Sequence, residues 1–175
     1  VAKNPEKYEG VYINRLLSAS YTPGSVFKLV TASAAIDLLK DIDQTVYHCD
    51  GALDIGGDKV TCPEAHGDVT LEKALAKSCN VAFAEITLKL GKENLQNYAD
   101  KAGLNASLDV DGMKTAKGVV KLTDAQGANL AWAGIGQYSD MVNPLNFMAF
   151  VGAIANDGVR VSPSIVLEKG AFSRM

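Results

Sequence analysis

The sequence predicts a mainly α-helical domain, and three observations support that fold class. Apolar residues recur at helical spacing in several segments, Gly and Pro residues separate these segments, and few segments alternate like strands. The chain has 175 residues, of which 47% are hydrophobic and 21% charged, enough for one globular core. We therefore expect residues 1–175 to form a single domain with too few strands for a complete sheet.

Charge and hydropathy exclude several classes of function. The formal net charge is −3 and no block of like charge occurs, so nothing favours a nucleic-acid partner or an anionic membrane surface. The longest apolar stretch, Leu145 to Ala155, contains Asn146 and is shorter than the roughly 18 residues of a spanning helix. The chain opens on Val1 without the layout of a signal peptide, which predicts a piece of a longer protein.

The first long predicted element is a helix from Ser25 to Leu39, introduced by Pro23-Gly24. It is apolar almost all the way round, so we expect other elements to surround it. From Asp41 to Gly67, repeated Gly residues and Pro63 predict a loop with short strand-like pieces such as Thr45 to Tyr47.

The rest of the chain is predicted to be largely helical, with a strand-like end. N-caps, helix stops and apolar spacing define these elements. They are helices from Thr70 through Lys77, from about Asn80 to Gly91, around Leu95 to Gly103, from Thr123 to about Ala133 and from Asn143-Pro144 to Asn156-Asp157-Gly158, then a strand-like Val159 to Leu167.

Ser25 and Lys28 form the first candidate site, because residues three apart at the start of a helix project from one face. A serine hydroxyl needs a neighbouring base to become a nucleophile, and a lysine can act as that base when desolvation lowers its pKa. The apolar neighbours Val26, Phe27, Leu29 and Val30 are expected to supply the desolvation. The positive end of the helix dipole would stabilise negative charge on a substrate carbonyl oxygen. A chain of this composition is expected to contain about one Ser-x-x-Lys pair by chance, so the pair alone is not evidence for a catalytic site. The support comes from its context, a Pro-Gly turn directly before Ser25.

Ser78-Cys79-Asn80 is the second candidate site, at the junction between two predicted helices. Here Ser78 could relay a proton, and the Asn80 amide could hold a substrate amide. Helix capping is the plainer interpretation, since Ser and Asn are common at helix ends. Order and context must decide between the two interpretations.

Taken together and in this order, the motifs resemble those of the penicillin-binding proteins and serine β-lactamases, whose signature is S-x-x-K, then S-x-N, then K-[ST]-G. The form Tyr-x-Pro-Gly-Ser-x-Phe-Lys, ending at Lys28, is similar to that of the penicillin-binding transpeptidases. Further segments agree in order between about residues 8 and 167: His66-Gly67-Asp68-Val69-Thr70-Leu71, Gly134-Ile135-Gly136-Gln137, Asn143-Pro144-Leu145 and Ala153-Ile154-Ala155-Asn156-Asp157-Gly158.

The resemblance implies the helical part of an α/β β-lactamase/transpeptidase-like fold, with most of the central antiparallel sheet outside this chain. It implies a peptidoglycan D,D-transpeptidase. Ser25 would attack a stem peptide ending in D-Ala-D-Ala, D-Ala would leave, and an amine of a neighbouring peptide would take the acyl group. Lys28 would be the general base, Ser78 the proton shuttle and Asn80 the substrate-binding amide, while β-lactams would trap Ser25.

The same resemblance implies no cofactor and no metal. Partners would be peptidoglycan stem peptides and β-lactam antibiotics, with cell-wall synthesis or division proteins as further candidates. The parent protein would act on the extracytoplasmic face of the bacterial cell membrane.

The chain departs from the family in the third motif. No K-[ST]-G follows Asp157-Gly158, where the family places it on the strand that lines the cleft. Lys114-Thr115-Ala116 lacks the glycine and lies before Gly134, so we interpret it as a decoy. Because the family's strand also carries the second oxyanion donor, we expect this chain alone to be inactive or weakly active.

Other functions remain alternatives. A D,D-carboxypeptidase, a β-lactamase and a β-lactam sensor share the first two motifs and differ in the fate of the acyl-enzyme. A catalytically silent binding or scaffold module of the same fold is the alternative from a different class.

Three cysteines and two histidines leave further alternatives. His48, Cys49, Cys62 and His66 could form a zinc site, but their spacing fits no structural zinc pattern well. A Cys49–Cys62 disulfide is favoured over zinc for an extracytoplasmic protein, with ordinary buried thiols as the remaining interpretation. For Cys79 we expect a packing role.

Overall fold

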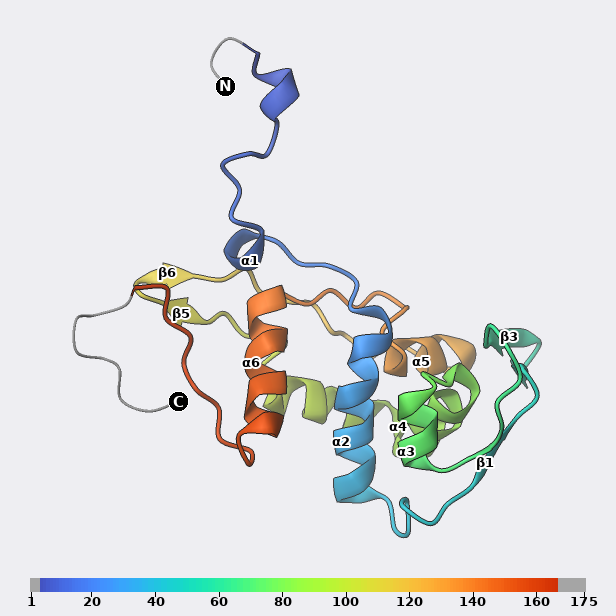
Figure 1. Cartoon of the computed structure of the whole chain (residues 1–175). Coiled ribbons are helices and arrows are strands. Elements are labelled where there is room, and N and C mark those ends of the chain that lie inside the picture. The colour runs from blue at the N-terminus through green and yellow to red at the C-terminus, as the bar shows by residue number, and fades with distance from the viewer. Residues whose placement is uncertain (1–3, 167–175) are drawn as a thin grey trace.

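The structure is a computed structural model that describes residues 4–166. Six α-helices and six short strands follow one another along this part of the chain. Two 3₁₀ turns add to them, Glu6–Tyr8 near the start and Gly24–Phe27, which leads into the second helix (Figure 1). The elements are α1 (Arg15–Ser18), α2 (Lys28–Leu38), β1 (Tyr47–Cys49), β2 (Ala52–Ile55), β3 (Asp58–Thr61), β4 (Gly67–Val69), α3 (Leu71–Ala76), α4 (Asn80–Lys101), β5 (Asp109–Val110), β6 (Met113–Lys114), α5 (Gly127–Gly134) and α6 (Pro144–Ala155).

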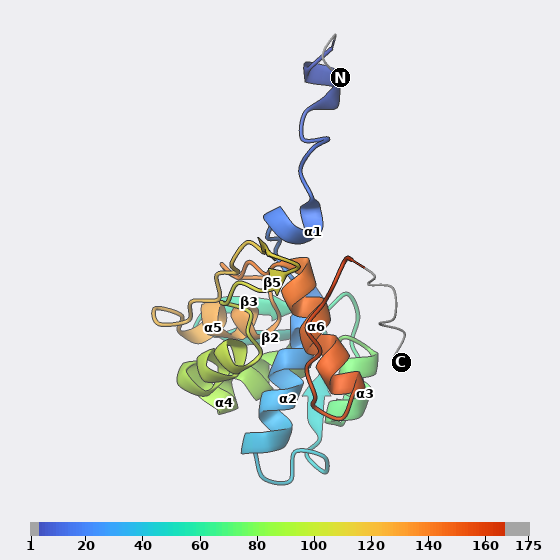
Figure 2. The ribbon, with the colours of Figure 1, turned by 90° about the vertical axis from the view of Figure 1, so that its left-hand side faces the viewer.

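Helix α4 is the centre of the packing. It contacts α2, α3 and α5, and also strands β1, β2 and β3. The helix breaks at Gly91, whose φ of 73° lies in the left-handed region that favours glycine, at the predicted stop. Its first half belongs to one hydrophobic core, with Phe83 and Ile86, and its second half to another, with Leu95 and Ala99. Both views show the segment before α1 extending away from this body (Figures 1 and 2).

Helix α2 confirms the predicted helix but is less enclosed than expected. Val30 from its first turn is fully buried in the core that contains Phe147 of α6. Near its other end, Ile36 and Leu38 are 62% and 49% exposed. Within the described residues, the expectation of elements all round this helix is therefore wrong for its C-terminal half.

The segment from Asp41 to Gly67 contains more strand than the loop with short strand-like pieces that we expected. Strands β1 and β4 pair antiparallel, with Tyr47 facing Val69 and Cys49 facing Gly67, and β2 and β3 form a hairpin in which Ala52 faces Thr61. The strands have only three or four residues, too short for clear alternation, and they form because β1, β2 and β3 pack on α4. Tertiary contacts therefore decide their structure.

Side-chain caps fix the starts of two other predicted helices. Thr70 accepts from the N–H of Lys73 at the start of α3, and Asn143 accepts from the N–H groups of Leu145 and Asn146 at the start of α6. Helix α5, in contrast, begins at Gly127 rather than just after Thr123.

Strands form only two-stranded sheets in residues 4–166, without a continuous central sheet. The predicted strand-like segment from residue 159 has no strand through residue 166, and Leu167 lies outside the described residues. Helix is the main regular structure of the described part. No helix between residues 4 and 166 has both the length and the apolar character to span a bilayer.

Candidate active site

Ser25 lies on the 3₁₀ turn that precedes α2, and its side chain is exposed. Gly24 has a φ of 61°, and its N–H donates to the carbonyl oxygen of Gly136 at 2.9 Å. Gly136 also has a positive φ, 77°, and a Cβ there would lie only 2.6 Å from the Cβ of Phe27. The close approach of these two glycine-containing turns sets the position of Ser25.

Lys28 is the first residue of α2, and only 1% of its surface is exposed. Its Nζ lies 3.2 Å from Ser25 Oγ and 5.7 Å from the ring centre of Phe83. Burial lowers the pKa of Lys28 to about 8, against the raising effect of the nearby Cys62 and Cys79 thiols. About a tenth of the amine is therefore neutral at pH 7.

Val26 does not contribute the desolvation that the sequence predicted, because it is 51% exposed. Phe27 and Val30 are fully buried, as expected, and Phe83 adds an aromatic face from α4. The apolar surroundings of Lys28 thus come from two helices rather than from α2 alone.

Ser78 and Asn80 lie on either side of Cys79 at the junction of α3 and α4. Ser78 has a φ of 52°, a left-handed conformation that ends α3 and turns the chain into α4. Lys28 Nζ lies 2.7 Å from the Ser78 carbonyl oxygen, 2.8 Å from Ser78 Oγ and 2.7 Å from Asn80 Oδ1. The structure therefore brings the four predicted site residues, Ser25, Lys28, Ser78 and Asn80, to one point.

The contacts of Lys28 also bear on its protonation state. An ammonium group has three N–H bonds, whereas four oxygen atoms surround Nζ within 3.2 Å. The longest of these contacts is the one to Ser25 Oγ. A neutral amine can donate to two of the other oxygens and accept the Ser25 hydroxyl proton, which is the arrangement that a general base requires.

Sequence reasoning missed two groups that orient Asn80. Its Nδ2 donates to the carbonyl oxygen of Thr61 at 2.7 Å, and its backbone N–H donates to Cys62 Sγ at 3.1 Å. Both acceptors lie at the end of β3, in the segment expected to be a loop. The Gly56-Gly57 pair between β2 and β3 was the one local signal of a hairpin that would bring them here.

Lys114-Thr115-Ala116 makes structural contacts in the described part of the chain. Lys114 is exposed in the short strand β6, and Thr115 is buried. The Thr115 hydroxyl accepts from the N–H of Leu108 and contacts Asn146 Oδ1 at 3.1 Å. These are contacts of a packing residue, consistent with its interpretation as a decoy.

A helical body with a serine, a buried lysine and a Ser-x-Asn turn at one point is the arrangement of the serine penicillin-recognising class. The sequence profile of the penicillin binding protein transpeptidase domain matches residues 2–172. The chain belongs to this family.

Relatives and solved structures agree with that assignment. Peptidoglycan D,D-transpeptidase PbpA of Mycolicibacterium smegmatis is 31% identical over 171 residues, covering 88% of this chain and 32% of PbpA. A ceftriaxone acyl-enzyme complex of penicillin-binding protein A from Mycobacterium tuberculosis superimposes with a TM-score of 0.77 at 25% identity, covering 90% of this chain and 38% of that one. Penicillin-binding protein PBP2 of Helicobacter pylori, in a complex with MreC, gives a TM-score of 0.82 at 25% identity, with coverages of 93% and 33%.

The chain spans about a quarter to a third of the length of the curated relatives that it matches. The solved neighbours are transpeptidase domains of α/β architecture, and the described residues correspond to a part of that fold.

Proposed function

We propose that this chain forms the serine-acylating part of a peptidoglycan D,D-transpeptidase, and that residues 1–175 belong to one such domain. The observation that carries the proposal is the position of Lys28 Nζ, which lies 3.2 Å from Ser25 Oγ and 2.8 Å from Ser78 Oγ. The D,D-transpeptidase PbpA supports the reaction, and the ceftriaxone acyl-enzyme complex of penicillin-binding protein A supports β-lactams as ligands.

In the proposed reaction, Ser25 Oγ attacks the carbonyl carbon of the penultimate D-Ala of a stem peptide, and Lys28 Nζ takes the hydroxyl proton. The tetrahedral intermediate places its oxyanion near the Ser25 N–H. As the C–N bond breaks, the proton passes from Lys28 Nζ through Ser78 Oγ to the departing amine of D-Ala. An amine of a second stem peptide then attacks the acyl-serine, loses a proton to the same relay and releases Ser25.

Asn80 is proposed to hold an amide of the stem peptide. Its carboxamide oxygen contacts Lys28 and its nitrogen contacts the Thr61 carbonyl, so the side chain is fixed before substrate binds. We further propose that the parent protein acts on the extracytoplasmic face of the bacterial membrane, with other cell-wall synthesis proteins as partners. The complex of the Helicobacter pylori relative with MreC supports such partners.

Mass spectrometry after incubation with a penicillin tests the nucleophile. We expect one adduct per chain on Ser25, formed slowly by the chain alone, because no K-[ST]-G segment follows Asp157-Gly158. An extended chain that carries K-[ST]-G should react faster. Ser25→Ala should form no adduct, whereas Ser33→Ala, which removes a hydroxyl from the adjoining helix α2, should react like the unchanged protein.

Three results would contradict the proposal. Adduct on Ser25→Ala would show that another residue is the nucleophile. Absence of adduct on both the chain and the extended chain would favour a silent binding or scaffold module. Rapid turnover of the adduct would favour a β-lactamase over a transpeptidase.

A further inference from the structure

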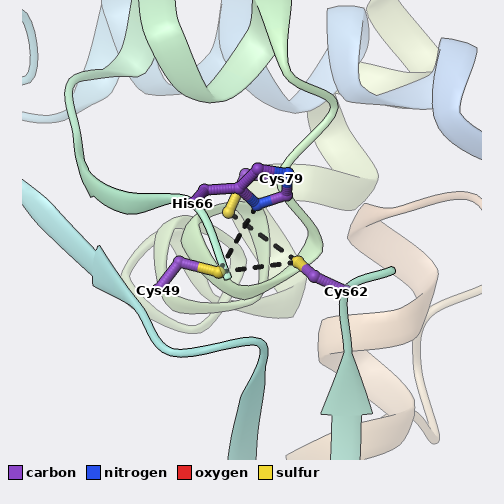
Figure 3. Close-up of side chains that lie close together, drawn as sticks. All are labelled: Cys49, Cys62, His66 and Cys79. Atoms are coloured by element: carbon purple, nitrogen blue, oxygen red, sulfur yellow. Dashed lines mark hydrogen bonds between the residues drawn. The ribbon is translucent and has the colours of Figure 1, made fainter. Parts of the chain in front are cut away.

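Four side chains with metal-binding atoms meet beside the candidate active site. Figure 3 shows Cys49, Cys62, His66 and Cys79 pointing toward one another from four separate segments. One ligand atom from each residue lies within 4.8 Å of all the others. The three sulfur atoms and one ring nitrogen therefore surround a volume suited to one ion.

Three of the six distances between the ligand atoms match the edges of a tetrahedron around zinc, and the other three are within 4.8 Å. With Zn–S bonds of about 2.3 Å and a Zn–N bond of about 2.0–2.1 Å, the S–S edges are about 3.8 Å and the S–N edges about 3.6 Å. Cys49 Sγ lies 3.7 Å from Cys62 Sγ and 3.5 Å from His66 Nδ1, and Cys62 Sγ lies 3.9 Å from Cys79 Sγ.

Backbone N–H groups of α4 face two of the three sulfur atoms. Cys62 Sγ accepts from the backbone N–H groups of Asn80 and Val81, and Cys79 Sγ accepts from that of Ala82. These donors belong to the first turn of α4, whose dipole favours negative charge.

The burial and orientation of the ligands also fit a metal site. Cys49 and Cys79 are fully buried, and the His66 side chain is 4% exposed. His66 turns Nδ1 to the cluster, and its Nε2 lies 4.0 Å from a carboxylate oxygen of the exposed Glu64, beyond hydrogen-bond distance.

A disulfide explains the cluster less well. The sequence ranked a Cys49–Cys62 bond above zinc, with ordinary buried thiols as the remaining interpretation. In the structure all three cysteines are free, and Cys49 Sγ and Cys62 Sγ are 3.7 Å apart, well beyond the roughly 2.05 Å of an S–S bond. A disulfide would also use only two of the three sulfurs and leave His66 without a role. The sequence spacing gave no zinc pattern because the ligands come from two hairpins and a helix start rather than from one compact motif.

We propose that Cys49, Cys62, His66 and Cys79 bind one structural Zn²⁺ ion in a tetrahedral Cys₃His site. The ion joins the ends of β1 and β3 and the start of β4 to the first turn of α4. Cys79 is the central residue of the Ser78-Cys79-Asn80 turn. A bond from the ion to Cys79 would therefore hold in place the turn that carries Ser78 and Asn80. The proposed site differs from a catalytic zinc site, because four protein ligands leave no open position.

Metal analysis of the full chain, purified without chelators and loaded with zinc, tests the site. Native mass spectrometry and elemental analysis should find one zinc per chain. We expect Cys49→Ser and His66→Ala to reduce retained zinc at least about tenfold, since even outer-shell changes cost that much in metal sites. His48→Ala is the matched control: His48 neighbours Cys49 in β1 but lies outside the cluster, and this variant should keep its zinc.

Cobalt loading of the unchanged chain gives a test that does not depend on variant folding. The Co²⁺ form should show the d–d and thiolate charge-transfer absorption of a tetrahedral sulfur-rich site, and zinc should displace it. An octahedral cobalt spectrum, a zinc-free chain after loading, or unchanged zinc in the ligand variants would overturn the proposal. A linked Cys49 and Cys62 peptide in a non-reducing map of the zinc-loaded chain would overturn it in favour of the disulfide.

Discussion

Lys28 combines burial with a crowded polar environment. Its side chain is 1% exposed, yet four oxygen atoms lie within 3.2 Å of Nζ. Desolvation disfavours the ammonium form, while the oxygens keep the amine in place. These contacts orient Lys28 toward Ser25 and poise it to exchange protons near neutral pH.

Acylation of Ser25 is therefore predicted to depend on pH through Lys28. The lowered pKa of about 8 means that the neutral amine is scarce at pH 6 and predominates above pH 8. We expect the rate constant for reaction with a fluorescent penicillin to rise about tenfold per pH unit below about 8 and then level off. Stopped-flow or gel-based labelling across this range measures it.

Two variants sharpen this prediction. Lys28→Arg keeps a cation of similar length but cannot supply a neutral base, so its labelling should be very slow at every pH. Lys73→Arg changes an exposed lysine of α3 and should leave the profile as it is. A profile that is flat between about pH 6 and pH 8 would contradict the role of Lys28 as the base.

The motif residues could be predicted from the sequence because their spacing is local. A separation of three places Ser25 and Lys28 on one face, and a separation of two places Ser78 and Asn80 around a turn. Contacts to Thr61 and Cys62 could not be predicted, since they depend on how β3 packs on α4.

At the scale of elements, helices with side-chain caps were predictable and short hairpins were not. Thr70 and Asn143 signal helix starts through their own hydrogen bonds. Strands of three or four residues are too short for a clear alternating pattern, and they gain stability mainly from contacts with α4. Gly56-Gly57, with φ values of 65° and 97°, was a hairpin signal that we interpreted only as loop punctuation.

The contact between the Gly136 turn and the Ser25 turn gives a prediction at this scale. In Gly136→Ala, the new Cβ would collide with the carbonyl oxygen of Gly24 and lie 2.6 Å from the Cβ of Phe27, at a φ of 77°. Moving backbone atoms costs more free energy than moving the end of a flexible side chain. The two turns must therefore separate, and Ser25 must move relative to Lys28. We expect penicillin labelling to slow at least about tenfold and stability to fall by about 1–3 kcal/mol.

Gly112→Ala is the matched control for this prediction. Gly112 has a similar φ of 83°, but a Cβ there meets nothing within 4 Å. This variant carries backbone strain without the collision, so it should lose stability and keep its labelling rate. Equal labelling by the Gly136 and Gly112 variants would show that the contact between the turns does not position Ser25.

At the scale of the whole molecule, two hydrophobic cores share α2 and α4. Ala32 and Phe83 belong to one core, and Val30 and Leu95 to the other. The sequence predicted the helices that contribute to both cores. It did not predict that α2 and α4 would each contribute some residues to one core and some to the other. That division depends on the bend at Gly91 and on the hairpins that cover the first half of α4.

A buried carboxyl group makes the stability of this whole assembly depend on pH. Asp140 is fully buried, and neither of its side-chain oxygens has a hydrogen-bond partner within residues 4–166. Burial raises its pKa from 3.8 to about 7, and the nearby Tyr138 backbone offsets only part of that rise. The folded protein therefore retains a proton at pH values where the unfolded chain has released it.

Between about pH 4 and pH 7 the unfolded state binds fewer protons than the folded state, so stability should fall as the pH rises. At about 1.4 kcal/mol per pKa unit, the whole fall is at most about 4 kcal/mol. Asp140→Asn cannot ionise. We therefore expect its free energy of unfolding, measured with urea, to rise relative to that of the unchanged protein as the pH increases across this range. Asp43→Asn, at an exposed carboxylate, should show no such growth. The free energies of unfolding of Asp140→Asn and the unchanged protein could instead differ by the same amount at pH 5 and pH 8. That result would show that Asp140 is ionised in the folded state and that a positively charged group lies near it.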